Sequence, residues 1–251
     1  MKRIWIFSAL LLMLCACGES KCQKQEYDIY LLIGQSNMAG RGDMIEADTL
    51  STIEGVWLLD SLGVPQAARN PLNLHSSIRK GVSVQRISPA TAFSSTIHQL
   101  TGRPVLLVVN ARGGTALREW MPGTHYFNEA VRRTREAMHY GKLKAILWHQ
   151  GESDSKDPAD YLDRLAEMVG ALRSELGEVP FVAGEIAREH PNADRFNPVI
   201  AKIGDAIPHS DYVSSEGCTL RVGDPHNHFT REGQLILGAR YAEKVKTMIY
   251  E

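Results

Sequence analysis

Short, almost wholly apolar runs alternate with longer amphipathic runs from Tyr27 onward. The apolar runs predict buried strands, because strands covered on both faces read as continuous hydrophobic segments. These predicted strands span 27–33, 105–109, 143–148, 181–186 and 212–215. The amphipathic runs have apolar residues at helical spacing and end at stop signals such as Gly102, Gly141 and Gly177. The predicted helices span 90–100, 127–140, 158–176, 198–207 and 231–250.

Strand and helix alternate throughout this pattern. Such alternation predicts right-handed βαβ crossovers and one parallel sheet with helices on both faces, which is a three-layer α/β architecture. The segment 43–89 has no clear period, and we interpret it as an insertion that contributes to substrate binding. No linker divides residues 27–251, so we expect a single domain there. Ligands of such sheets bind outside the carboxyl ends of the strands, so residues that directly follow strands are the candidates for a site.

The first residues have the pattern of an export signal. Lys2 and Arg3 precede an apolar stretch that is shorter than the roughly 20 residues needed to span a bilayer. The stretch ends in Leu14-Cys15-Ala16-Cys17, which resembles a bacterial lipobox. We therefore expect 1–16 to be a signal peptide, Cys17 to carry lipid, 17–26 to form a tether, and the exported protein to be anchored at a membrane surface. A signal that is cleaved without lipidation, or a short buried helix, is the alternative.

The composition excludes several classes of protein. The chain has 251 residues, of which 43% are hydrophobic and 23% charged, so it is neither disordered nor fibrous. Its formal net charge is −1 and it has no run of Lys and Arg, so nucleic acid is not an expected partner. The pattern leaves the oligomeric state open.

A serine stands between two glycines directly after the first predicted strand, in the string Gly34-Gln35-Ser36-Asn37-Met38-Ala39-Gly40. Glycine tolerates the backbone angles and close contacts of a sharp turn, which suits a nucleophilic serine whose own N–H helps to hold an oxyanion. Glycine and serine are also common in ordinary turns, so this spacing alone is weak evidence.

Three further strings lie at comparable places. Asn110-Ala111-Arg112-Gly113-Gly114-Thr115 and Trp148-His149-Gln150-Gly151-Glu152-Ser153-Asp154 each come at the end of a predicted strand. Asp224-Pro225-His226-Asn227-His228-Phe229 precedes the last helix, which contains Leu237-Gly238-Ala239-Arg240-Tyr241. A base that activates serine must reach its hydroxyl and be oriented by a third group. A histidine beside a carboxylate suits that role.

Together, the four strings resemble the signature blocks of the sialic-acid-specific acetylesterase and acetylxylan esterase group of SGNH hydrolases. They occur in the family's order and span Gly34 to Tyr241. The resemblance implies the SGNH hydrolase fold, an αβα sandwich with a mainly parallel, flavodoxin-like sheet. It also implies a carbohydrate O-acetylesterase that needs neither cofactor nor metal. The acetylated substrate would be a xylan-type polysaccharide or a sialic acid.

The resemblance assigns roles to individual residues. Ser36 is the nucleophile, His228 is the base, and Asp224 is the acid that orients His228. In the family the acid stands three residues before the histidine, whereas this chain has Pro225 there and Asp224 one residue earlier. A bulged loop can still bring Asp224 to the ring, and a backbone carbonyl that orients His228 in a Ser-His dyad is the alternative.

The resemblance also places the oxyanion hole. Its expected donors are the N–H groups of Ser36 and Gly114 and the side-chain amide of Gln150. The residues expected to support the loops or contact substrate are Gln35, Asn37, Gly113, Glu152 and His226. The aromatic residues considered as a sugar-stacking platform, with packing as the alternative, are Trp57, Trp120, Tyr126 and His190.

Two other functions compete with this interpretation. A metal hydrolase would use Asp224, His226 and His228, with His149 and Glu152 from another loop. That reading has no recognised metalloprotease spacing and leaves the serine string unexplained. A non-catalytic glycan-binding lipoprotein would be expected to lack Ser36 or His228, and both are present.

Overall fold

The computed structural model describes residues 26–224 and 228–251 of the chain. Within that part, seven strands form one sheet in the order β3-β2-β4-β1-β5-β6-β7. Neighbouring strands run parallel except β3, which pairs antiparallel with β2 at the edge. The strands are β1 Tyr27–Gly34, β2 Val56–Leu59, β3 Pro65–Ala67, β4 Val105–Val109, β5 Gly141–His149, β6 Phe181–Gly184 and β7 Ser210–Val213. Without β2 and β3, the remaining order is that of flavodoxin-like sheets, which confirms the predicted fold class.

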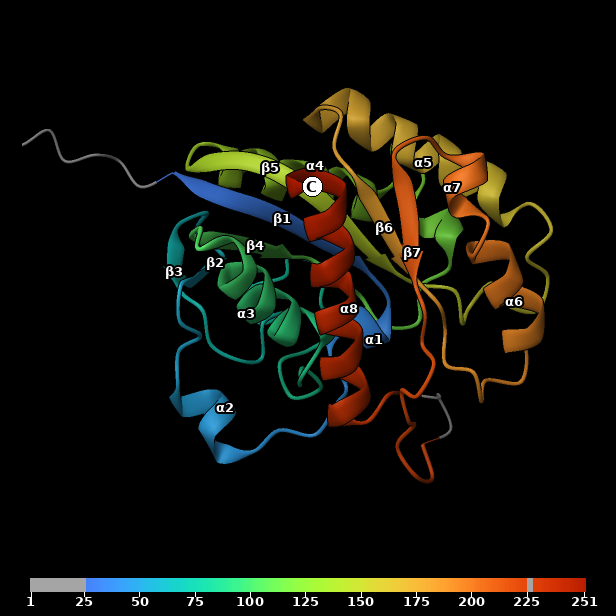
Figure 1. Cartoon of the computed structure of the whole chain (residues 1–251), viewed down its shortest axis with the longest axis horizontal. Coiled ribbons are helices and arrows are strands. Elements are labelled where there is room, and N and C mark those ends of the chain that lie inside the picture. Colours follow the sequence, from blue (N-terminus) through green and yellow to red (C-terminus); the bar gives the residue numbers. More distant parts are fainter. Residues whose placement is uncertain (1–25, 225–227) are drawn as a thin grey trace, which may run out of the picture.

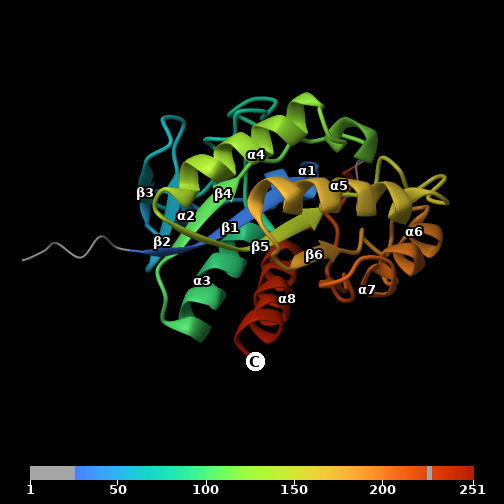
Figure 2. The same ribbon diagram turned by 90° about the horizontal axis from the view of Figure 1, so that it is seen from above.

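Helices cover both faces of the sheet. Helices α4 (His125–Met138) and α5 (Tyr161–Leu176) lie on one face, and α3 (Pro89–Thr101) and α8 (Arg231–Tyr250) lie side by side on the other (Figure 1, Figure 2). The shorter helices are α1 Ser36–Ala39, α2 Glu46–Leu50, η1 Leu117–Trp120, α6 Ala193–Ile200 and α7 Ile203–Ala206.

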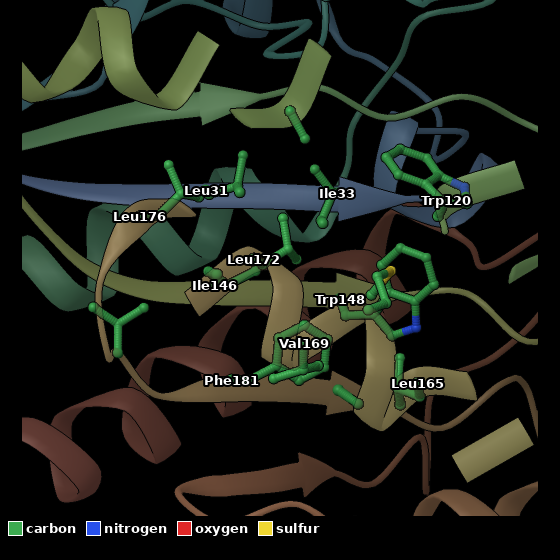
Figure 3. Close-up of a cluster of buried hydrophobic side chains, with 14 of the residues drawn as sticks. Leu31, Ile33, Trp120, Ile146, Trp148, Leu165, Val169, Leu172, Leu176 and Phe181 are labelled. Carbon is green, nitrogen blue, oxygen red and sulfur yellow. The ribbon is translucent and has the colours of Figure 1, made fainter. Parts of the chain in front are cut away.

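The central strand β1 contributes to two hydrophobic cores, because successive side chains of a strand point to opposite faces. Leu31 and Ile33 pack in the core beneath α4 and α5, together with Trp148 and Leu165 (Figure 3). The side chains that lie between them in sequence, such as Leu32, pack in the core beneath α3 and α8. Burial on both faces explains why these strands are continuous apolar runs in the sequence.

The segment 43–89 is more regular than the sequence pattern indicated. It contains α2 and adds β2 and β3 to the edge of the sheet. The apolar run of β2 is only four residues long. Its partner strand β4 lies far from it in the sequence. Neither feature produces a local period that sequence analysis can detect.

Two predicted helix boundaries were wrong. The helix predicted at 198–207 is two helices, because α6 begins at Ala193 and the chain turns between Ile200 and Ile203 before α7. Gly141 does not cap the helix before it but opens β5. A Cβ at Gly141 would lie 2.0 Å from the carbonyl oxygen of Tyr27, so close pairing with β1 explains this glycine.

The predicted export signal, the predicted lipidation site Cys17 and the predicted tether up to residue 25 lie outside the described residues. Among the residues that are described, none of the helices combines the length and the apolar character that crossing a membrane requires.

Candidate active site

Ser36 lies at the turn between β1 and α1, where it is the first residue of the helix. The turn requires glycine at position 34, because the φ of Gly34 is 133° and a Cβ there would lie 2.2 Å from the carbonyl oxygen of His149 on β5. The side chain of Ser36 is therefore presented at the carboxyl end of the central strand. This is the place where ligands of parallel sheets bind.

His228 and Asp224 are hydrogen-bonded despite the extra residue between them. The Nδ1 atom of His228 lies 2.9 Å from the Oδ2 atom of Asp224. Arg221 also approaches this carboxylate, with 3.5 Å between its NH1 atom and Oδ2. The contact gives His228 the carboxylate partner that orients a catalytic histidine, and it leaves Nε2 as the ring atom that can serve as the base.

A pocket of about 390 Å³ brings the predicted site residues together. It is lined by Gln35, Ser36, Arg41, Lys80, Gly113, Gly114, Glu152, Ser153, His190 and His228. Most of these residues follow β1, β4 or β5 directly, so the pocket lies where three adjacent parallel strands end. The nucleophile and the base predicted from the sequence thus line one cavity.

The glycine pair after β4 lies against the serine. A Cβ at Gly113 would lie 3.3 Å from the Cβ of Ser36, so glycine allows the loop to approach this closely. Within the described part of the chain, the backbone N–H groups of Ser36, Gly113 and Gly114 have no hydrogen-bond acceptor. Unpaired N–H groups beside a nucleophile are available to hold an oxyanion.

Asn37 connects three parts of the site from a fully buried position. Its Nδ2 donates to Oε1 of Glu152 at 2.6 Å, and its Oδ1 accepts from the N–H of Phe229 and from Nε2 of Gln234. Because Phe229 follows His228, this side chain ties the serine turn to the histidine segment. These contacts connect the serine turn to the loop after β5 and to the segment that contains His228.

Glu152 is a buried carboxyl group with an altered pKa. Burial raises its pKa to about 6, which outweighs the opposing effect of the hydrogen bond from Asn37. Among the described residues, its Oε2 atom has no hydrogen-bond partner. His149, the last residue of β5, has a pKa lowered to about 4 by burial, so its ring is neutral near pH 7.

Gln150 has a different environment from the one expected. Its Nε2 donates to the carbonyl oxygen of Thr115 at 3.0 Å and to Oδ2 of Asp154 at 2.6 Å, and its Oε1 accepts from the hydroxyl of Tyr161 at 2.8 Å. The pocket described above does not include it. Its role as an oxyanion donor stays a prediction, and its contacts argue for a structural role.

Two cationic residues of the pocket were missed by the sequence analysis. Arg41 directly follows the serine string, and a Cβ at Gly113 would lie 2.7 Å from its NH2 atom. Burial lowers the pKa of Arg41. Lys80 comes from the insertion, and its Nζ atom would lie 3.2 Å from a Cβ at Gly114. Only the adjacency of Arg41 to the string offered a sequence signal, since the insertion has no pattern that predicts where Lys80 lies.

The proposed sugar-stacking platform does not form. Trp120 is fully buried against Trp148 and Tyr126, and Trp57 packs edge-on against Tyr27 beside the core. Trp120 is part of the hydrophobic core, and Trp57 and Tyr126 pack against that core. His190, which was considered with them, does line the pocket.

The metal-site alternative receives no support from the described residues, among which no group of three or more His, Cys, Asp and Glu side chains is placed to hold a metal ion. His226, which that alternative uses, lies outside the described residues, as do its neighbours Pro225 and Asn227.

Comparison with known proteins extends these observations. The sequence profile of one family, described as carbohydrate esterase, sialic acid-specific acetylesterase, matches residues 26–247. A probable carbohydrate esterase from Arabidopsis thaliana is 30% identical over 254 residues, covering 90% of this chain and 94% of that protein. Its solved structure superposes with a TM-score of 0.78 at 26% identity, covering 88% of this chain and 98% of that one.

Two more distant structures share the fold. NanS has a TM-score of 0.67 at 16% identity, with 89% of this chain and 98% of that one covered. A carbohydrate acetylesterase from Xanthomonas citri has a TM-score of 0.65 at 17% identity, with 89% of this chain and 57% of that one covered. At these identities the likeness is one of fold.

Proposed function

Because the chain belongs to the carbohydrate esterase family of sialic acid-specific acetylesterases, we propose that it is a serine esterase that removes O-acetyl groups from carbohydrates. The observation that supports this most strongly is the pair formed by His228 and Asp224, 2.9 Å apart, at a pocket that Ser36 also lines. A nucleophile, a base and an orienting acid in one cavity are the parts that acyl transfer requires.

In the first half of the reaction, Oγ of Ser36 attacks the acetyl carbonyl carbon while Nε2 of His228 takes the hydroxyl proton. The carbonyl electron pair moves onto oxygen, and the N–H groups of Ser36 and the glycine pair stabilise the resulting oxyanion. The intermediate then collapses, and the sugar oxygen leaves with the proton from His228. Asp224 stabilises the imidazolium that forms in between.

In the second half, water attacks the acetyl group on Ser36. His228 takes a proton from the water and returns it to Oγ, and acetate is released. Every proton movement uses a group already at the pocket, so this chemistry requires no cofactor.

The charge of the pocket favours an acidic sugar over a neutral one. Arg41 and Lys80 both line it, and within the described residues neither forms a salt bridge with a carboxylate. The NH1 group of Arg41 is bound to the carbonyl oxygens of Gly40 and Val84, which fixes the guanidinium beside the glycine pair. A carboxylate on the substrate, as in an O-acetylated sialic acid, would pair with these cations.

A panel of acetyl esters tests this proposal. Acetate release is measured from O-acetylated sialic acid, from acetylated xylan and from a simple acyl ester, with wild-type protein and Ser36→Ala. We expect Ser36-dependent release that is fastest from the acidic sugar. Faster release from xylan would reject the acidic substrate, and equal release by Ser36→Ala would reject the serine mechanism.

We also propose that the protein is exported and held at a membrane surface by lipid on Cys17. The support is the order of the positive residues, the apolar stretch and the Leu-x-Ala-Cys string near the amino terminus. Lipid chains add membrane affinity of about 0.8 kcal/mol per buried CH₂, so an anchored protein does not need a spanning helix.

A further inference from the structure

His190 lines the active-site pocket from the loop between β6 and α6. The strand order places this loop and the glycine pair on opposite sides of Ser36, because β6 lies beyond β5 and the glycine pair follows β4. Arg41 and Lys80 both lie beside the glycine pair. The steps of acyl transfer need no group on the β6 side, so His190 is available to contact another part of the substrate.

A tight turn holds His190 in place. Its backbone N–H donates to the carbonyl oxygen of Ala187 at 3.0 Å, and its carbonyl oxygen accepts from the N–H of Ala193 at 2.9 Å. Asn192 ties this turn to the loop after β5, since its Nδ2 donates to Oγ of Ser155 at 3.3 Å. The ring is therefore carried by a fixed backbone, as a residue that positions substrate requires.

The hydrogen bond of the His190 side chain determines its tautomer. Its Nδ1 lies 3.2 Å from the backbone nitrogen of Asn192, so Nδ1 is the acceptor and the proton of the neutral ring is on Nε2. Burial lowers the pKa of His190, which keeps the ring neutral near pH 7. Within the described residues, Nε2 has no hydrogen-bond partner, and it is not among the fully enclosed polar atoms that lack one. His190 therefore presents an uncharged N–H donor to the pocket.

The chemistry of this donor fits a sugar hydroxyl. A neutral N–H binds an oxygen lone pair and, unlike Arg41 and Lys80, does not require a negative charge. The acetyl group offers only the ester oxygens that take part in the reaction, whereas the sugar carries hydroxyl oxygens as well. A contact at His190 would therefore recognise the sugar and not the acetyl group.

We propose that Nε2 of His190 donates a hydrogen bond to a hydroxyl oxygen of the acetylated sugar and so positions the ester at Ser36. His190 makes this bond in the bound substrate and in the transition state alike, and it takes no part in proton transfer. An acidic sugar then lies across Ser36, with its carboxylate at Arg41 and Lys80 and a hydroxyl at His190. This inference rests on the proposed esterase function.

Two substitutions of His190 separate the pocket donor from the turn. His190→Gln places an amide N–H near the position of Nε2. His190→Asn places an amide oxygen near Nδ1, where it can accept from Asn192 but cannot reach the sugar. With O-acetylated sialic acid, we expect His190→Asn and His190→Phe to raise KM about fivefold or more, with kcat within about twofold of wild type. His190→Gln should keep KM within about twofold of wild type.

Two further measurements distinguish a lost sugar contact from a general defect. Phenyl acetate has no sugar hydroxyl, so its kcat/KM should stay within about twofold of wild type in all three variants. Free sialic acid, the deacetylated product, should have an inhibition constant about fivefold higher in His190→Asn and His190→Phe. His139→Phe is the matched control, because His139 is exposed beside the amino end of β5, at the opposite end of that strand from the pocket.

The crossed pattern of rescue decides the role of His190. The donor role is overturned if His190→Phe leaves KM unchanged, if His190→Gln does not restore KM, or if phenyl acetate is affected as strongly as the sugar ester. Restoration by His190→Asn would show that the turn, and not the donor, is what matters. Failure of the proposed function looks different, because wild-type protein would then release no acetate from either ester.

Discussion

At the scale of single residues, the contact between His228 and Asp224 shows that one extra residue between acid and histidine, relative to the family pattern, is tolerated. Asp224 stands four positions before His228, where the family pattern has the acid three positions before, and yet its carboxylate lies 2.9 Å from Nδ1 of His228. The three residues between them are outside the described part of the chain. The evidence that the extra residue does not separate the acid from the histidine is therefore the contact itself.

Three substitutions at the triad residues should differ in severity. Ser36→Ala and His228→Ala are each expected to lower kcat by on the order of 10⁶-fold, because nucleophile and base act as a unit. Asp224→Ala should cost less, on the order of 10⁴-fold, since the acid orients the ring but does not take the proton. Steady-state rates of acetate release measure the order. Near-wild-type activity of Asp224→Ala would mean that another group, such as a backbone carbonyl, orients His228.

The buried carboxyl of Glu152 should make stability depend on pH. Its folded-state pKa is raised from 4.5 to about 6, so the folded protein binds this proton more tightly than the unfolded chain does. Its contribution is therefore full below pH 4.5 and is lost as the pH rises through 6. Glu152→Gln removes the charge and should raise the free energy of unfolding at pH 8 by about 2 kcal/mol, with little change at pH 4.

Urea unfolding of Glu152→Gln at several pH values measures this effect. Glu167→Gln is the matched control, because Glu167 is exposed on α5 and the substitution should leave the pH profile unchanged. If the profile of Glu152→Gln matched that of wild type, Glu152 would not be the group that titrates.

At the scale of elements, the sequence predicted the parallel strands well and the insertion poorly. Strands such as β4 are buried on both faces, so their apolar runs are visible in the sequence. Strand β2 pairs with the distant strand β4, and the edge strand β3 pairs in turn with β2, so neither strand is set by its local sequence alone. Lys80 was missed for the same reason, because only the folded insertion brings it to the pocket. For Gln150 the sequence string suggested a role in the oxyanion hole. The direction of its amide is determined instead by Thr115, Asp154 and Tyr161, which the string does not predict.

The insertion also braces the loop that carries the glycine pair. Asn73 is fully buried, donates to the carbonyl oxygen of Ala111 and accepts from the N–H of the same residue, both at 3.0 Å. Arg112 adds a bond from its NH1 atom to the carbonyl oxygen of Ile78. The loop after β4 is therefore held in place by residues of the insertion.

Asn73→Ala should destabilise the protein, because the N–H of Ala111 would lose its acceptor in a buried place. We expect a loss of about 1–3 kcal/mol in the free energy of unfolding, together with a lower kcat, since the glycine pair would be less firmly positioned. Chemical denaturation and steady-state kinetics measure the two effects. Asn128→Ala, at an exposed position on α4, is the control. An Asn73→Ala protein as stable as this control would contradict the bracing role.

At the scale of the whole molecule, the fold and the family agree with what the sequence strings indicated. The flavodoxin-like strand order brings the ends of β1, β4 and β5 together, and the site strings directly follow these strands. The family profile covers almost all of the described residues, so the resemblance is confirmed over the domain as a whole.

Anchoring of the molecule is a separate prediction. If Cys17 carries lipid, bacterial cells that process lipoproteins and express the chain should incorporate labelled palmitate into the wild-type protein but not into Cys17→Ala. The variant should appear in soluble fractions or remain unprocessed, and its esterase activity should be retained, because the described domain begins after the tether. Absence of label from the wild type would contradict lipidation.

The acetyl-enzyme on Ser36 is the most direct test of the central claim. Wild-type protein that has been exhaustively treated with chelator is mixed with an activated acetyl ester, quenched in acid and analysed by peptide mass spectrometry. The account predicts an acetyl group on the peptide that contains Ser36, and no such adduct in Ser36→Ala. An active enzyme that forms no adduct on Ser36, or one whose activity is lost to chelator and restored by zinc, would contradict the serine mechanism.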